Sequence, residues 1–295
     1  MKNTLAYFIG LILLTSCTQE IILELPEMES QIVVEGYIET GSAPYVSLTR
    51  SIPFYQTIDE NSLAEQLVTN ADLVTVSDYN GNTDTLTLKL VAEYPFFKYE
   101  ATNPTIIGQE RNRYDLRIEV EGQVLTSSTW IPEIIQLDST WFELEIDEDT
   151  MQLGTIHANL SDPDTLGNYY KFYSKRIGED TRFISPAGST VDDRLVNGES
   201  FPFFYFRSED PLDPDTTLAP NDPRSFYWEV GDQVVVKYST MDYNSYQFWL
   251  TKEADEQSGG SPFSAPVTTV SNINGGLGIW GGFGVSIDTV NCTID

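Results

Sequence analysis

The chain has 295 residues and a formal net charge of −29, from 16 basic and 45 acidic residues. This charge argues against binding to nucleic acid or to anionic lipid surfaces, because both require clustered Lys and Arg. Hydrophobic residues make up 40% of the chain, which is enough to form substantial buried cores.

The N-terminus has the layout of a bacterial lipoprotein export signal. Lys2 supplies a positive charge, residues 5–14 form an apolar run, and small residues precede Cys17. The run is too short for a permanent transmembrane helix, which needs about 20 residues. We therefore predict a signal peptide over residues 1–16 and lipidation of Cys17, followed by a lipidated tether over residues 17–30. The alternative is a buried apolar N-terminus with an incidental cysteine.

Alternation of apolar and polar residues dominates the rest of the chain. It is clearest over residues 85–90, 114–120 and 142–146, and it is typical of antiparallel strands with one buried face. Asn80-Gly81 predicts a hairpin turn because these residues tolerate the positive φ angles that such a turn requires. Glu121-Gly122 separates two further strands in the same way. The sequence therefore predicts a mainly β protein.

Pro132 marks the predicted boundary between two β-domains, because proline cannot donate a hydrogen bond within a central strand. We expect residues 31–131 to form an N-terminal β-sandwich. Residues 132–295 are expected to form a second, larger antiparallel β-domain with one short helix. Residues 245–254 are the better helix candidate, and residues 60–67 are a weaker one.

Histidine-based catalysis is disfavoured. His157 is the only histidine, so a Ser-His-Asp triad or a His-containing zinc site would have to use it. No catalytic motif accompanies it, which favours a packed or surface histidine. Cys292 has no intramolecular partner once Cys17 carries lipid, and an inert thiol is favoured over a reactive or bridging one. We assign no catalytic residue, no metal ligand and no cofactor.

Three further segments each have a functional and a structural interpretation. Residues 276–281 match Gly-x-Gly-x-x-Gly, but no helix pattern follows, so a glycine-rich strand is favoured over a dinucleotide site. Asp162, Asp164 and Asn168 resemble an incomplete calcium loop, and an ordinary turn is favoured while calcium binding stays open. The aromatic run 202–206 predicts either a stacking platform for sugars or peptides, or a strand covered by its neighbours.

Several segments resemble the Bacteroidota lipoprotein family called domain of unknown function 4249. Asn70 departs from the glycine that the family often has before Ala71, and the aromatic residue after the late glycines is here Trp280. In chain order the similar segments are residues 32–38, 46–51, 71–76, 167–170, 261–267 and 271–280.

The resemblance implies a β-rich lipoprotein of the outer membrane, with surface or periplasmic orientation left open. It also implies a neighbouring TonB-dependent receptor as a partner, and it brings no catalytic residues. The N-terminal domain looks like the immunoglobulin-like and carboxypeptidase-regulatory-like sandwiches. Fold alone does not give function.

We expect a non-enzymatic accessory protein that captures a glycan or peptide ligand or docks on a TonB-dependent transporter. Membrane attachment would come from the N-terminal lipid alone. Two alternatives stay open: a surface glycan hydrolase that uses paired carboxylates, and a structural or adhesive module of the envelope.

Overall fold

The computed structural model describes residues 29–52, 66–91, 95–148, 151–210, 218–219, 221–258 and 268–294. Within these ranges the protein is mainly β, as predicted, with several sheets built almost entirely from antiparallel pairs. The predicted signal peptide, Cys17 and most of the weaker helix candidate at residues 60–67 lie outside the described residues. No helix in the described ranges is both long enough and apolar enough to cross a membrane.

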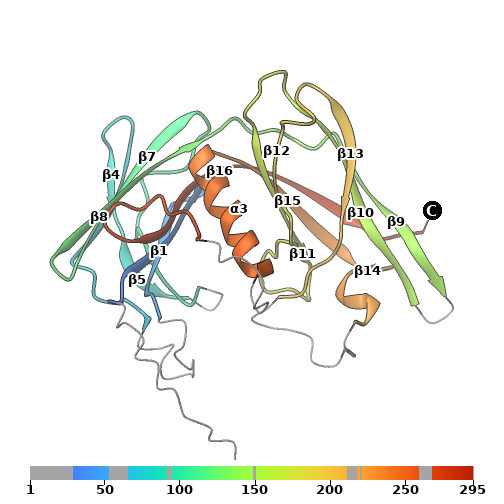
Figure 1. Cartoon of the computed structure of the whole chain (residues 1–295), viewed down its shortest axis with the longest axis horizontal. Coiled ribbons are helices and arrows are strands. Elements are labelled where there is room, and N and C mark those ends of the chain that lie inside the picture. Colours follow the sequence, from blue (N-terminus) through green and yellow to red (C-terminus); the bar gives the residue numbers. More distant parts are fainter. Residues whose placement is uncertain are drawn as a thin grey trace, which may run out of the picture. The chain divides into compact units, whose positions relative to one another are not determined.

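An eight-stranded sheet runs through the compact unit Gln31–Asp295 (Figure 1). All neighbouring strands pair in antiparallel fashion except β1 and β16, which are parallel. Across the sheet the order is β12 (Thr190–Asp192), β11 (Tyr169–Arg176), β15 (Gln233–Met241), β16 (Leu277–Asn291), β1 (Ile32–Glu39), β2 (Tyr45–Arg50), β6 (Phe97–Glu100) and β5 (Thr87–Leu90).

Two smaller sheets pack on one face of the eight-stranded sheet. The first has the order β4 (Thr83–Thr85), β3 (Leu73–Asp78), β7 (Asn112–Val120) and β8 (Gln123–Ile131). The second has the order β13 (Ser200–Tyr205), β10 (Met151–Ser161) and β14 (Trp228–Glu229), with β9 (Ser139–Glu148) also paired to β10.

The two faces of the eight-stranded sheet pack against different elements, and strand register determines which side chains lie on each face. Successive side chains on a strand point to opposite faces. Val34 on β1 packs in the core under the first small sheet, and Val236 on β15 packs in the core under the second. Tyr37 on β1 points the other way and packs with Phe248 of helix α3 (Tyr243–Ser258) in a third apolar cluster. The helix therefore covers the face that the small sheets leave open.

The two small sheets close separate cores, one on each side of the predicted boundary at Pro132. The first core is completed by Ile273 and Trp280, which come from the C-terminal part of the chain. The parallel pairing of β1 with β16 also joins the predicted domains 31–131 and 132–295 in one sheet. The division into two domains stays a prediction. A test of whether either one folds by itself must take into account that they share this sheet.

The prediction of one half-buried strand over residues 85–90 is wrong. The chain leaves one sheet and enters another at Leu86, so β4 pairs with β3 while β5 pairs with β6. Leu86 is buried, but Leu90 lies on the edge strand β5 and is 74% exposed. The alternation at 114–120 predicted a strand correctly, because β7 lies between β3 and β8 and buries its apolar face completely.

Helix α3 extends the predicted helix 245–254 by a few residues at each end. Asp242 fixes where it begins, because its Oδ1 accepts a hydrogen bond from the backbone N–H of Ser245 at 2.7 Å. The other carboxylate oxygen, Oδ2, accepts from Thr129 Oγ1 at 2.9 Å and from the Trp130 N–H at 3.1 Å. One side chain therefore starts the helix and ties it to β8.

Candidate functional site

A cavity of about 480 Å³ lies between helix α3 and the open face of the eight-stranded sheet, and we call it the α3 cavity. Strands β11, β15, β16, β1 and β2 contribute its floor, while α3 and residues 182–185 contribute its walls. Its volume falls in the range of roughly 300–1,000 Å³ that is typical of small-molecule sites.

Aromatic rings form much of the lining of the α3 cavity. Tyr37 lies at their centre, with ring centroids 5.6 Å from Tyr45, 5.8 Å from Phe283 and 6.3 Å from Trp249. The Tyr37 and Trp249 rings are nearly parallel, with an interplanar angle of 16°. The register places Tyr37 directly opposite Tyr45, so strand pairing itself brings these rings together. Such flat apolar faces suit a ligand that contains rings.

A buried ion pair forms part of the cavity lining. Lys171 on β11 is fully buried, and its Nζ lies 2.5 Å from Glu253 Oε1 on α3. The same Nζ donates to Ser189 Oγ at 2.7 Å and lies 4.6 Å from the Trp249 ring centroid. Thr190 Oγ1 donates to Glu253 Oε1 at 2.6 Å. Every charge here has a partner, which a buried pair requires.

The surroundings of this pair shift both pKa values downward. Burial lowers the pKa of Lys171, although the neighbouring Glu253 opposes this effect. Burial alone would raise the pKa of Glu253, but the attraction of Lys171 and the hydrogen bonds from Ser189 and Thr190 outweigh it and leave that pKa below its ordinary value. Glu253 is thus held as a carboxylate.

The other lysines that line the α3 cavity are also paired. Lys237 Nζ lies 2.8 Å from Glu39 Oε1, with the Tyr173 and Phe183 rings 4.7 and 4.9 Å from the same nitrogen. Lys252 pairs with Glu256 along the helix. Of the four carboxylates among the described lining residues, only Glu35 has no lysine partner, and it accepts a hydrogen bond from the Tyr37 hydroxyl at 3.0 Å.

His157 lies on β10 and is not among the residues that line this cavity. Its ring centroid is 5.3 Å from Trp141 and 5.4 Å from Phe204, and its Nε2 is 3.0 Å from Thr155 Oγ1. The side chain of His157 is 16% exposed. It is a packed histidine, as predicted.

Cys292 is fully buried in the core under the second small sheet. Burial, with a smaller contribution from Asp232, raises the pKa of its thiol to about 12. A neutral, buried thiol is a poor nucleophile. This environment favours the inert role over the reactive one.

In the segment that resembles an incomplete calcium loop, Asp162 and Asn168 make internal hydrogen bonds. Asp162 is buried, and it accepts hydrogen bonds from the Tyr170 hydroxyl and from the Gly198 N–H, the latter at 3.1 Å. Asn168 Nδ2 donates to the Thr165 carbonyl at 2.7 Å. Among the described residues, no three His, Cys, Asp or Glu side chains converge as a metal site would require.

The Gly-x-Gly-x-x-Gly match lies at the start of β16, so the predicted glycine-rich strand is confirmed. Gly278 has a φ of +107°, and a Cβ there would lie 1.9 Å from the Val34 carbonyl oxygen. Only glycine lets β16 approach β1 this closely. The glycine pattern therefore serves strand pairing.

The aromatic run 202–206 is partly buried and partly exposed, so each of its two predicted interpretations describes one face of the strand. Phe203 and Tyr205 point into the second core, whereas Phe204 is 53% and Phe206 is 43% exposed. On the exposed side, ring contacts continue from Phe204 to Phe206 and on to Tyr227, at 5.6 and 5.5 Å. One face of the strand is buried and the other offers an aromatic stripe.

Sequence reasoning identified none of the residues that line the α3 cavity. The available signal was a lysine placed among aromatic or β-branched residues, as Lys171 is on β11 and Lys237 on β15. Such a lysine has either a solvated head group or a buried partner. Only the fold shows that Lys171 meets Glu253 from a distant helix.

A family model described as Domain of unknown function (DUF4249) matches residues 18–288. The match covers most of the chain, including every strand that lines the α3 cavity up to the last residues of β16. It confirms the resemblance drawn from the sequence segments. A search of curated proteins finds no match.

Proposed function

The chain belongs to the family described as Domain of unknown function (DUF4249), and on this premise we propose that it is a lipid-anchored, non-catalytic protein that captures a ligand for a TonB-dependent outer-membrane transporter. The α3 cavity is the proposed capture site. The observation that supports it is the combination of aromatic faces and fixed ion pairs in one cavity of about 480 Å³. We propose a glycan or a short peptide as the ligand.

The state of the carboxylates favours capture over hydrolysis. A glycoside hydrolase needs one carboxyl group that holds a proton at working pH and a second that acts as base or nucleophile. In the α3 cavity, Glu39, Glu253 and Glu256 are each ion-paired with a lysine, and the pKa of Glu253 lies below its ordinary value. Paired charges can instead orient a polar ligand over the aromatic rings.

The membrane part of the proposal is supported by the export signal in the sequence, and the transporter part rests on what the family resemblance implies. The export signal before Cys17 predicts acyl chains, and each buried methylene contributes about 0.8 kcal/mol to membrane attachment. Holding two proteins in one membrane raises their effective concentration, so a weak contact with a transporter suffices. The outer membrane is the proposed location.

Tryptophan fluorescence and calorimetry test capture directly. We expect a glycan or peptide from a defined panel to change the emission of the wild-type protein and of Trp130→Phe, but not of Trp249→Phe. Trp130 is the matched control, because it is 43% exposed on β8 and does not line the cavity. Replacing Trp249 with Ala should weaken binding about fivefold, as expected for loss of one aromatic contact of about 1 kcal/mol.

The same panel separates the alternatives. Turnover of a glycan that is abolished in Glu35→Gln would establish the hydrolase. Binding to envelope components without any soluble ligand would establish the structural or adhesive module. Either result would replace capture as the function of the cavity.

The transporter partner is tested by cross-linking intact cells and purifying the lipidated protein in mild detergent. We expect a large outer-membrane receptor to co-purify with the wild-type protein and to be lost with Cys17→Ala. Recovery of the lipoprotein alone after cross-linking would contradict this part of the proposal while leaving ligand capture intact.

A further inference from the structure

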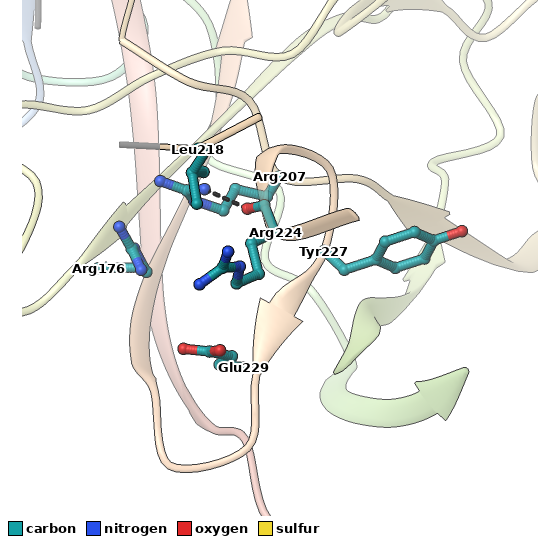
Figure 2. Close-up of a pocket in the computed structure, with 6 residues that line it drawn as sticks. All are labelled: Arg176, Arg207, Leu218, Arg224, Tyr227 and Glu229. Carbon is teal, nitrogen blue, oxygen red and sulfur yellow. Dashed lines mark hydrogen bonds between the residues drawn. The ribbon is translucent and has the colours of Figure 1, made fainter. Parts of the chain in front are cut away.

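A second, smaller cavity gathers three arginines from separate parts of the chain, and we call it the arginine cavity (Figure 2). Arg176 ends β11, Arg207 follows β13, and Arg224 lies in the short 3-10 helix η1 (Pro223–Ser225). In Figure 2 the ring of Tyr227 points away from these arginines, whereas the carboxylate of Glu229 lies on their side. The cavity has a volume of about 100 Å³, and its other lining residues are Leu218, Tyr227 and Glu229.

The three arginines differ in how their charge is balanced. Arg224 donates to Asp222 at 2.7 Å, and Arg176 Nε lies 3.7 Å from Asp180. Arg207 is only 7% exposed, yet it makes no ion pair with any described residue. One of its terminal nitrogens donates to the Arg224 carbonyl, as the dashed line in Figure 2 shows.

The guanidinium of Arg207 therefore has unused donor capacity. Its Nε is buried and has no hydrogen-bond partner among the described residues, and the same holds for Arg176 Nε. Burying a charge without a partner is costly, and burying like charges together adds to the cost. Burial, followed by the repulsion of Arg176, lowers the pKa of Arg207, and the attraction of Asp180, Glu209 and Asp232 only partly opposes this shift. An anion in the cavity would relieve both effects.

We propose that the arginine cavity binds a phosphate or sulfate group. Guanidinium groups match the oxygens of such anions with two parallel hydrogen bonds, and three of them converge here. The volume of about 100 Å³ is below that of a site for a whole drug-sized ligand, so it holds one charged group. Glu229 disfavours a second anionic group beside the first.

The exposed aromatic stripe indicates that the anion is part of a larger molecule. Tyr227 belongs both to the arginine cavity and to the stripe, where its ring centroid lies 5.5 Å from that of Phe206. The organic part of an ester can lie over these rings while its anionic group enters the cavity. The proposed ligand class is thus a phosphate or sulfate ester.

Calorimetric titration with inorganic phosphate, sulfate, phenyl phosphate and acetate tests the site. We expect saturable binding of phosphate and sulfate, tighter binding of phenyl phosphate, and weaker binding of acetate. Arg207→Met should lower the affinity for phosphate at least tenfold. The matched control is Arg194→Gln, because Arg194 has a 76% exposed side chain and lies outside the cavity. Trp249→Phe should also bind phosphate normally, which separates this site from the α3 cavity.

A second measurement keeps the test independent of how Arg207→Met folds. In the wild-type protein, the side-chain Nε–H resonances of Arg207 and Arg176 should shift on adding phosphate, with the same midpoint as the calorimetric titration. Equal affinity for inorganic phosphate and phenyl phosphate would identify the free ion as the ligand and overturn the ester. No saturable binding up to ~10 mM, about ten times a millimolar dissociation constant, would overturn the site.

Discussion

The α3 cavity and the arginine cavity handle buried charge in opposite ways. In the α3 cavity, each lysine that lines the site has a carboxylate beside it, as Lys171 has Glu253. In the arginine cavity, Arg207 is buried without a carboxylate partner among the described residues. In the α3 cavity the lysines are already paired, so the shape of the cavity and its aromatic rings determine which ligand binds. In the arginine cavity the unpaired cation favours an anionic ligand.

This contrast is sharper because the protein is strongly acidic. With 45 acidic and 16 basic residues, a carboxylate is readily available to any arginine. Arg176 and Arg224 each form an ion pair with one, whereas Arg207 forms none with any described residue and feels Asp180, Glu209 and Asp232 only at longer range. We infer that the difference between the cavities is functional.

Removing one partner of the paired charges should have the largest effect. Glu253→Ala leaves Lys171 buried without a counter-charge, and we expect the free energy of unfolding to fall by about 3–5 kcal/mol. Lys171→Met should cost a similar amount, because Glu253 is then the unpaired group. Urea denaturation measures both, and a loss below about 1 kcal/mol in each would show that the pair is not buried as described.

The unpaired cation should respond in the opposite way. Arg207→Met removes a charge that has no partner, so in buffer without phosphate or sulfate we expect the unfolding free energy to change by no more than about 1 kcal/mol. Adding phosphate should stabilise the wild-type protein but not the variant. A loss as large as that of Lys171→Met would show that Arg207 is already paired within the protein, and would remove the contrast.

The pH dependence of stability sharpens the comparison further. Burial acts to raise the pKa of Glu253, but Lys171 and the hydrogen bonds outweigh it, so this pKa is lowered in the folded protein. The ionised Glu253 therefore stabilises the fold above its unfolded pKa of about 4.3. This stabilisation is lost as the pH falls through the lower folded pKa. The stability difference between wild type and Glu253→Gln should thus be constant near neutral pH and shrink in acid. A difference that grows on acidification would contradict this sign.

The smallest effect is expected at the exposed ion pair of the same helix. Lys252 and Glu256 have side chains that are 39% and 60% exposed, so Glu256→Gln should change the unfolding free energy by less than about 1 kcal/mol. High salt should erase the difference, since solvent-exposed charges are screened. An effect as large as that of Glu253→Ala would mean that burial does not distinguish the two pairs.

The sequence predicted the elements whose signals are local. The alternation over residues 114–120 predicted β7, and the helix candidate at residues 245–254 predicted α3. Residues 85–90 misled the same reasoning, because an alternating pattern does not show that the chain changes sheets at Leu86. Local pattern gives strands but not which sheet each strand joins.

Neither cavity could be predicted from the sequence, because the residues that form each one are far apart in the chain. Glu39 and Lys237 pair across 198 positions, and they meet only because β1, β16 and β15 are neighbours in one sheet. The three arginines likewise have no spacing that resembles a motif. At His157 the absence of any accompanying catalytic motif was enough for the sequence interpretation, and the structure agrees, because the ring packs between Trp141 and Phe204.

Ligand capture in the α3 cavity is tested most directly by intermolecular NOEs with the tightest ligand of the glycan and peptide panel. We predict contacts between ring or side-chain protons of that ligand and the side chains of Trp249 and Tyr37. Contacts confined to other surfaces of the protein, with the signals of Trp249 and Tyr37 unchanged at saturation, would contradict the account.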